Sequence, residues 1–244
     1  MLVIGYDNTA VRDDLIAVHN RAWERLGSPG TWWPARKRVA IAAEVRRVRD
    51  CSLCQRRKEA LSPYSIEGEH ESSAELPSAV IEVVHRIVSD PGRLTRRWYD
   101  GVIGSGLSEA HYVEIVGVIA TIVMIDTYAR GIGQEPPTLP AAERGDPSNY
   151  MPDGVGELGA WVYMIRFKDH QPPESDLFPN GPIANIRASL SLVPGEARNF
   201  NDLVDHHYAW RPTPDDFYST QRSISQAQTK LLAARVSALN GCFY

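Results

Sequence analysis

The sequence has little cysteine, no excess of basic charge and no long apolar run. Its 244 residues include three cysteines, too few and odd in number for a disulfide scaffold, which favours a reducing, cytoplasmic compartment. The formal net charge is -4, whereas a general nucleic-acid binder is expected to be basic. The longest mainly apolar run, residues 115–125, is about half of the ~20 residues that a membrane span needs, and the first residues lack the pattern of a signal peptide. We therefore expect a cytoplasmic protein with no membrane and no nucleic-acid partner.

An ordinary globular composition with helical periodicity is what the chain does have. Apolar residues make up 43% and charged residues 23%, so a core can form without staples. Apolar positions recur at helical spacing and few segments alternate with a period of two, which predicts an all-α fold. Ser108 is expected to cap the longest helix. The predicted helices span residues 13–26, 35–49, 55–61, 78–88, 93–102, 108–130, 183–192, 197–208 and 223–239, with a short extended piece at 161–165.

A proline-rich segment divides the chain. Residues 134–159 contain five prolines and several glycines, a composition typical of a linker or of an arm that wraps the surface. We predict a first lobe at 1–133, a Pro/Gly-rich linker or arm at 134–182, and a second, incomplete or degenerate lobe at 183–244.

The two predicted lobes share a weak internal repeat. Aligning Cys51 with Cys242, an offset of 191 residues, also matches Ala42 with Ala233, Ala43 with Ala234 and Val45 with Val236. Both segments are amphipathic helices that run into a cysteine. A second Cys-x-x-Cys would place the partner of Cys242 directly after Tyr244, so the second site is expected to be degenerate or truncated, and truncation is the favoured alternative.

The chemistry is expected at Cys51-Ser52-Leu53-Cys54. Two thiols three residues apart at a helix start share a face and lie close enough to form a disulfide. The helix dipole favours the thiolate there, and nine basic residues against three acidic ones lie in or beside residues 36–58. A lowered thiol pKa raises reactivity at neutral pH, and the second thiol resolves the product as a disulfide.

Three interpretations of this pair compete. A redox dithiol is favoured, because intracellular Cys-x-x-Cys pairs are often redox-active. Ordinary buried core cysteines come second. Structural zinc comes third, because tetrahedral zinc takes four ligands and the chain has no second Cys-x-x-Cys. We therefore expect no metal and no cofactor.

The helix that enters Cys-x-x-Cys and the C-terminal stretch Arg235–Tyr244 together resemble the alkylhydroperoxidase D-like group of the carboxymuconolactone decarboxylase superfamily. The likeness is clearest over residues 35–61 and 223–244 and extends more loosely to 78–130 and 183–208. It implies two tandem all-helical bundle lobes and a homo-oligomer. It also implies a peroxidase-like, peroxiredoxin-type thiol oxidoreductase, with Cys51 and Cys54 as the dithiol, a peroxide or other small molecule as substrate, and a lipoyl- or thioredoxin-type dithiol as electron donor.

The sequence departs from the family pattern at both proton-relay positions. Lys58 stands where the family has a histidine, four residues after the second cysteine. Val39 stands where a glutamate is usual, and Lys230 stands there in the second copy. Glu44, two helical turns before Cys51, is the hypothetical substitute proton donor.

Each substitute has a structural alternative. Glu44 could simply pair with Arg47 on a solvated helix face. Lys58 could stabilise a thiolate, although an exposed lysine is the commoner outcome. The candidate catalytic residues are therefore Cys51, Cys54, Glu44 and Lys58, with Cys242 as their counterpart in the second copy.

The histidines are weaker candidates for proton transfer. His70 lies in an acidic loop that could fold back toward the motif, whereas His85 and His111 lie on predicted helices and are expected to be structural. Because the relay residues are missing, two other functions stay open. One is a non-redox enzyme like the decarboxylase branch, with acid–base residues in the same pocket, and the other is an interaction scaffold that has lost the chemistry.

Overall fold

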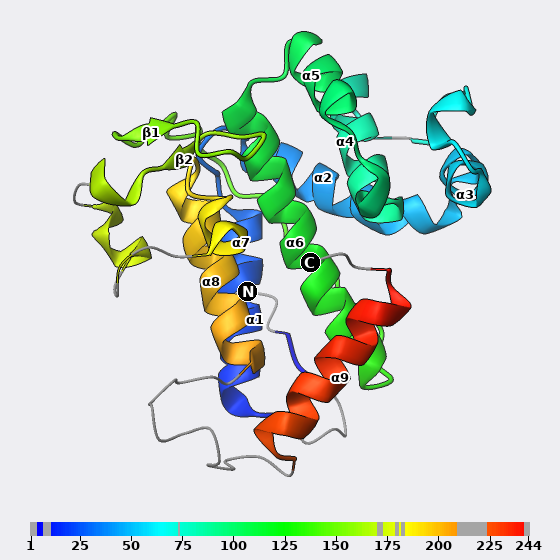
Figure 1. Cartoon of the computed structure of the whole chain (residues 1–244). Helices are drawn as coiled ribbons and strands as arrows, with labels where there is room; N and C mark the ends of the chain where they lie inside the picture. The colour runs from blue at the N-terminus through cyan, green and yellow to red at the C-terminus, as the bar shows by residue number, and fades with distance from the viewer. Residues whose placement is uncertain are drawn as a thin grey trace.

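The computed structural model describes residues 4–6, 11–72, 74–169, 173–178, 181, 184–208 and 224–241. This part of the chain is mainly helical, so the all-α prediction is confirmed (Figure 1). Its α-helices are α1 (Asp13–Gly27), α2 (Ala35–Arg47), α3 (Ser52–Glu59), α4 (Ser78–Ser89), α5 (Arg96–Gly104), α6 (Glu109–Gly131), α7 (Asn185–Ala188), α8 (Pro194–Tyr208) and α9 (Gln226–Leu239).

Short 3-10 turns and one small sheet complete the described structure. The turns are η1 (Val48–Asp50), η2 (Pro63–Ser65), η3 (Pro91–Arg93), η4 (Phe167–Asp169) and η5 (Glu174–Leu177). Strand β1 (Val155–Gly156) pairs antiparallel with β2 (Met164–Ile165), and Val155 lies opposite Ile165. The extended piece expected at 161–165 is thus present at its end.

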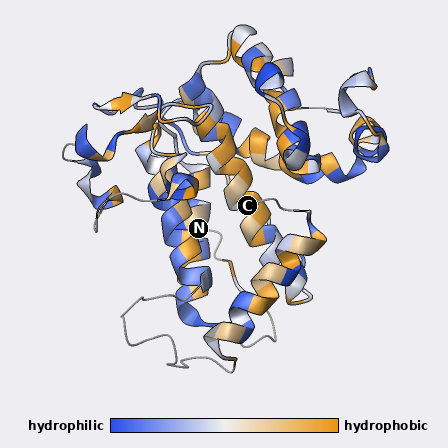
Figure 2. Cartoon of the chain, viewed as in Figure 1, coloured by the Kyte–Doolittle hydropathy of each residue, from blue (hydrophilic) through white to orange (hydrophobic). Residues whose placement is uncertain are grey.

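Helix α6 is the centre of the core. As predicted, Ser108 caps it, accepting a hydrogen bond from the backbone N–H of His111. The helix is apolar on nearly all sides, which is typical of a helix surrounded by protein. It is long and apolar enough to cross a membrane, but 67% of its most apolar stretch is buried within the fold, which is consistent with a soluble protein (Figure 2).

Four of the described helices pack around α6 and contribute to the core. Helices α1, α2, α4 and α8 contact it, and α4 also packs on α2 and α3. Trp23 of α1 is 1% exposed, and its indole N–H donates to the carbonyl of Thr138 at 2.8 Å. Further along, the backbone N–H of Glu143 donates to the carbonyl of Gly27. The proline-rich segment therefore lies along the surface of the helices as an irregular arm.

Several helix boundaries differ from those predicted, and three of these differences lie around the cysteine pair and α5. The helix expected at 55–61 begins at Ser52, because Cys51 already takes the extended N-cap conformation. The helix expected from residue 93 begins at Arg96, where the Thr95 side chain accepts from the N–H of Trp98 and caps it. The helix expected at 35–49 ends at Arg47 and tightens into η1.

The C-terminal region contributes to the same core through α8. Leu203 of α8 is fully buried and belongs to the hydrophobic cluster that includes α1 and α6. The predicted division into lobes, with its boundaries, stays a prediction. Helix α9 begins with a capping box between Ser225 and Gln228, and it leaves Leu231 and Leu239 exposed. Cys242, the residue of the predicted second site, lies outside the described residues.

Candidate functional site

The thiols of Cys51 and Cys54 lie at the junction between η1 and α3. The backbone N–H of Cys51 donates to the carbonyl of Val48, which closes η1, and the carbonyl of Cys51 accepts from Gln55, which opens α3. Leu53 points into the core with no exposed surface. Cys51 is 1% exposed, Cys54 is 3% exposed, and both are free thiols.

Two histidines converge on these sulfurs from elsewhere in the chain. His70, in the loop before α4, places its Nδ1 atom 3.6 Å from the Sγ atom of Cys51 and 3.6 Å from that of Cys54. His85, on α4, places its Nδ1 atom 3.2 Å from the Sγ atom of Cys54. One ligand-type atom from each of the four residues lies within 4.8 Å of the other three.

A carboxylate lies behind each imidazole. The Nε2 atom of His85 is 2.8 Å from Oε1 of Glu44, and both side chains are completely buried. The Nε2 atom of His70 is 2.8 Å from Oε2 of Glu82. The indole of Trp98 donates to the other oxygen of Glu82 at 3.0 Å. Both rings are therefore fixed from behind, with Nδ1 facing the sulfurs.

Burial and hydrogen bonding set opposite charge states on the two histidines. Burial lowers the pKa of His70, but its hydrogen bonds to Cys54, Glu82 and Cys51 outweigh this effect and raise the pKa to about 10. Burial raises the pKa of Glu82, but His70, Trp98 and Arg57 bring it down to about 2. For His85, burial dominates over the hydrogen bond to Glu44, and the pKa is lowered.

Cys51 is the thiol whose pKa the surroundings lower. Burial raises the pKa of Cys51, but interactions with His70 and with the backbone amides of Cys54 and Glu71 outweigh it, and the pKa is lowered. The raised pKa of His70 and the lowered pKa of Cys51 together favour an imidazolium beside a thiolate. His85 is neutral, so Nε2–H donates to Glu44 and Nδ1 accepts from the thiol of Cys54.

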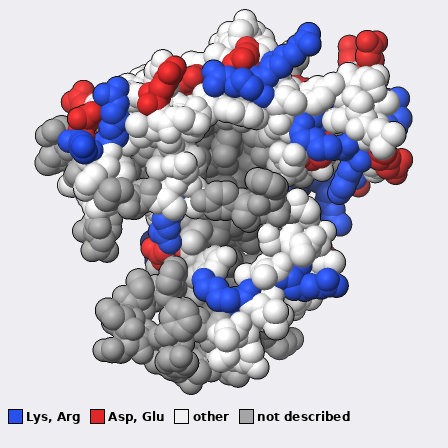
Figure 3. Space-filling model, viewed as in Figure 1, with Lys and Arg blue, Asp and Glu red and all other residues white. Residues whose placement is uncertain are grey.

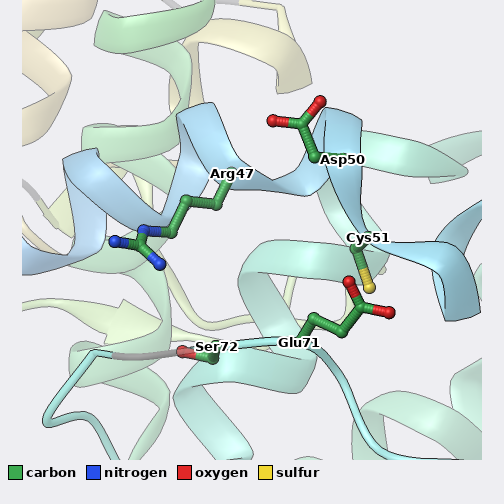
Figure 4. Close-up of a pocket in the computed structure, with 5 residues that line it drawn as sticks. All are labelled: Arg47, Asp50, Cys51, Glu71 and Ser72. Atoms are coloured by element: carbon green, nitrogen blue, oxygen red, sulfur yellow. The ribbon is translucent and has the colours of Figure 1, made fainter.

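The site opens to the surface at one thiol. A hollow of about 580 Å³ is lined by Cys51 together with Arg47, Asp50, Glu71 and Ser72 (Figure 4). The Sγ atom of Cys51 points toward the Glu71 carboxylate (Figure 4). Ser52 donates a hydrogen bond to that carboxylate and so fastens the loop to the start of α3. Cys51 therefore borders this hollow, whereas Cys54 is not among the residues that line it, and both thiols are almost fully buried.

Of the predicted site residues that the structure describes, Cys51, Cys54 and Glu44 belong to the site, whereas Lys58 is exposed. Cys51 and Cys54 lie together, and Glu44 joins them through His85 instead of pairing with Arg47 on a solvated face. The Lys58 side chain is exposed on α3, away from the polar contacts that the two thiols make.

His85 was not among the predicted site residues, and no metal-ligand cluster was predicted. Cys51, Cys54, His70 and His85 form such a cluster in the described part of the chain. The histidines follow Cys54 by 16 and 31 residues. These spacings match no short metal motif, so the sequence signal was confined to the loop position of His70.

Neither the charges on the visible face nor the comparisons with known proteins indicate a particular function. Acidic and basic side chains are interspersed over the visible face (Figure 3). No protein-family model, no curated protein and no solved structure matches the chain. The interpretation therefore depends on the geometry of the site.

Proposed function

We propose that the protein is a thiol-dependent, peroxidase-like oxidoreductase that cycles Cys51 and Cys54 between dithiol and disulfide. The observation that carries this proposal is the continuous hydrogen-bonded chain from Glu44 through His85 to the Cys54 thiol, beside a second thiol that lines a surface hollow. This chain provides a nucleophile, a base and a group that orients the base, the arrangement by which enzymes activate thiols. It replaces the histidine and glutamate that are missing from the family positions.

In the first step Cys51 is the attacking group. Its thiolate attacks the terminal oxygen of a peroxide ROOH, a sulfur–oxygen bond forms and the oxygen–oxygen bond breaks. The departing RO⁻ takes the Nδ1 proton of the His70 imidazolium, 3.6 Å from the sulfur, and leaves as ROH. The products are a Cys51 sulfenic acid and a neutral His70, whose Nε2 still faces Glu82.

In the second step Cys54 resolves the sulfenic acid. His85 takes the Cys54 thiol proton at Nδ1, and Glu44 stabilises the resulting imidazolium. The Cys54 thiolate attacks the Cys51 sulfur, the disulfide forms, and hydroxide leaves with the proton from His85 as water. An external dithiol then reduces the disulfide by exchange, supplying two electrons and two protons, and His70 regains its proton.

The resemblance extends the proposal to the family and to the partners. We assign the chain to the alkylhydroperoxidase D-like group, with a lipoyl- or thioredoxin-type dithiol as electron donor, a homo-oligomeric assembly and a cytoplasmic location. The free, adjacent thiols support a reducing environment.

The test is peroxide consumption by the purified full-length chain, with a dithiol donor and a chelator present throughout. We expect Cys51→Ser to abolish turnover, and Cys54→Ser to stop after one peroxide, with a sulfenic acid that dimedone traps. Glu44→Gln should slow disulfide formation by about 10²-fold, the lower range of a general base's contribution. The matched control is Glu59→Gln, which changes an exposed glutamate on α3 and should react like the parent.

Equal turnover in both cysteine variants and the parent contradicts the proposal. Unchanged turnover in Glu44→Gln alone removes Glu44 from the mechanism and leaves the dithiol in place.

A further inference from the structure

The four converging side chains are also a complete set of ligands for a metal ion. Zinc in proteins takes four nitrogen or sulfur ligands in a tetrahedron, with zinc–sulfur bonds of ~2.3 Å and zinc–nitrogen bonds of ~2.0–2.1 Å, so neighbouring sulfur and nitrogen ligands lie about 3.5 Å apart. The three sulfur–nitrogen distances recorded here are 3.6, 3.6 and 3.2 Å. Three of the six separations among the four donor atoms therefore match a tetrahedral site, and all six are at most 4.8 Å.

The orientation of the imidazoles is that of metal ligands. A histidine that binds a metal through one nitrogen usually donates its other N–H to a carboxylate, which fixes the ring and strengthens the ligand. His85 and His70 both turn Nδ1 toward the sulfurs and Nε2 toward a carboxylate at 2.8 Å. The carboxylates are Glu44 and Glu82, from α2 and α4, so two separate elements repeat the same arrangement.

Charge and burial point to the kind of metal. Two thiolates balance the charge of a divalent ion, and sulfur with imidazole favours zinc over the oxygen-seeking magnesium and calcium. Four protein ligands leave no open coordination position, which is typical of a structural site. Cys51, Cys54 and His85 are at most 3% exposed, and the hollow beside Cys51 offers an entry path.

We propose that Cys51, Cys54, His70 and His85 bind one Zn²⁺ ion per chain when the thiols are reduced. Zinc binds cysteine as the thiolate and histidine as the neutral imidazole, so the protons that these groups carry are released as the metal enters. The metal joins η1, the start of α3, the loop at His70 and α4. Because it uses both sulfurs, bound metal and a Cys51–Cys54 disulfide exclude each other. This inference depends on the ligand geometry and does not require the proposed peroxidase activity.

The first experiment titrates the reduced, metal-free full-length chain with Co²⁺ without oxygen, and then with Zn²⁺. We expect one Co²⁺ per chain, with the sulfur-to-cobalt absorption band and the intense visible bands of a tetrahedral site, and displacement by one equivalent of Zn²⁺. His70→Ala and His85→Ala should weaken binding by at least 100-fold, and Glu82→Gln by about 10- to 100-fold. His206→Gln, a change on the partly exposed side of α8, is the matched control and should bind like the parent.

A second measurement uses the parent protein and avoids variants that fail to fold. Diamide, which oxidises a dithiol to a disulfide, is added to the zinc-loaded chain with a chromogenic zinc indicator. We expect one Zn²⁺ to be released per disulfide formed, and dithiothreitol should restore binding. Weak, non-stoichiometric Co²⁺ binding without the sulfur band overturns the inference, and so does zinc that stays bound after both thiols are oxidised.

The two proposals fail separately. Metal binding is measured without peroxide, and turnover is measured with a chelator present. A chain that binds zinc but consumes no peroxide refutes the proposed function only, whereas a chain that turns over but binds no metal refutes the zinc site only.

Discussion

A buried charge cluster that joins α2, α6 and α8 gives the most quantitative prediction. The guanidinium of Arg38 donates through Nη1 to Glu114 and, at 2.7 Å, to Glu196. Arg38 is 2% exposed, Glu114 has no exposed surface and Glu196 is 3% exposed. The backbone N–H of Trp32 donates to the second oxygen of Glu114 at 2.6 Å. The perturbation is Arg38→Ala. It removes the guanidinium that pairs with both Glu114 and Glu196 and leaves these two buried carboxylates without that positive charge.

The expected loss follows from this burial. Removing one partner of a buried ion pair costs about 3–5 kcal/mol, because the charge left behind is neither paired nor solvated. For a chain of 244 residues each kcal/mol corresponds to about 2–4 °C in Tm, so the Tm should fall by about 6–20 °C. The triple variant Arg38→Met, Glu114→Leu, Glu196→Leu removes every charge of the cluster, and its stability should equal or exceed that of the parent.

The loss should also depend on pH. Burial is the main cause that raises the pKa of Glu114, and Glu196 adds to it, while Arg38 acts against both. A carboxyl whose pKa is raised by folding binds its proton more tightly in the folded state, so its stabilising effect is present at low pH and is lost as pH rises through the folded pKa. Arg38→Ala removes the opposing charge. The deficit should therefore be larger at pH 8 than at pH 5.

Urea and thermal unfolding at both pH values measure the effect. Arg36→Ala, on the exposed side of the same helix, is the control and should change stability by no more than about 0.5 kcal/mol. The reasoning is refuted if Arg38→Ala costs less than about 1 kcal/mol, or if its deficit shrinks as the pH rises.

Two further predictions concern the site and its support. In the reduced, chelator-treated protein iodoacetamide should modify Cys51 before Cys54, because Cys51 lines the hollow and its pKa is lowered, whereas Cys54 does not line the hollow. Peptide mass spectrometry over time measures the two rates, and equal rates contradict the assigned roles. Thr95→Ala should cost about 1 kcal/mol because it removes the N-cap of α5, whereas Thr95→Ser should keep most of it, and urea midpoints that do not separate the two variants count against the cap.

The helices were predictable because their signals are local. The apolar positions of α1 repeat at helical spacing, α6 contains the longest mainly apolar run, and Ser108 caps α6 as expected. The start of α5 was less predictable, because Arg93 belongs to the 3-10 turn η3 and the helix begins only after Thr95, which caps it. The helix predicted at 183–192 was too long, because the apolar residues after Ala188 are buried without being helical.

Only the part of the site whose residues are close in the sequence was predictable. Cys51 and Cys54 share a helix start, so sequence spacing brings the two thiols together, whereas Glu44 joins them only through His85. His85 reaches Cys54 only because α4 packs against α2 and α3, a tertiary contact without a sequence period. His70 depends on the path of a loop. His85 was therefore predicted to be structural, although of the two histidines it makes the closer contact to a thiol.

The carboxylate behind His85 argues against the remaining alternative, ordinary core cysteines. Within the described residues, Oε2 of Glu44 is buried without a hydrogen-bond partner, and such a group costs free energy that an apolar side chain of similar size would not. A core selected for packing alone gains nothing from this acid. A positive charge on the far side of the imidazole explains it, because either a proton taken from Cys54 or a metal ion at Nδ1 is stabilised through the ring by the carboxylate. Glu44→Gln should therefore weaken both metal binding and disulfide formation while leaving the fold as stable as before, a combination that a packing role does not produce.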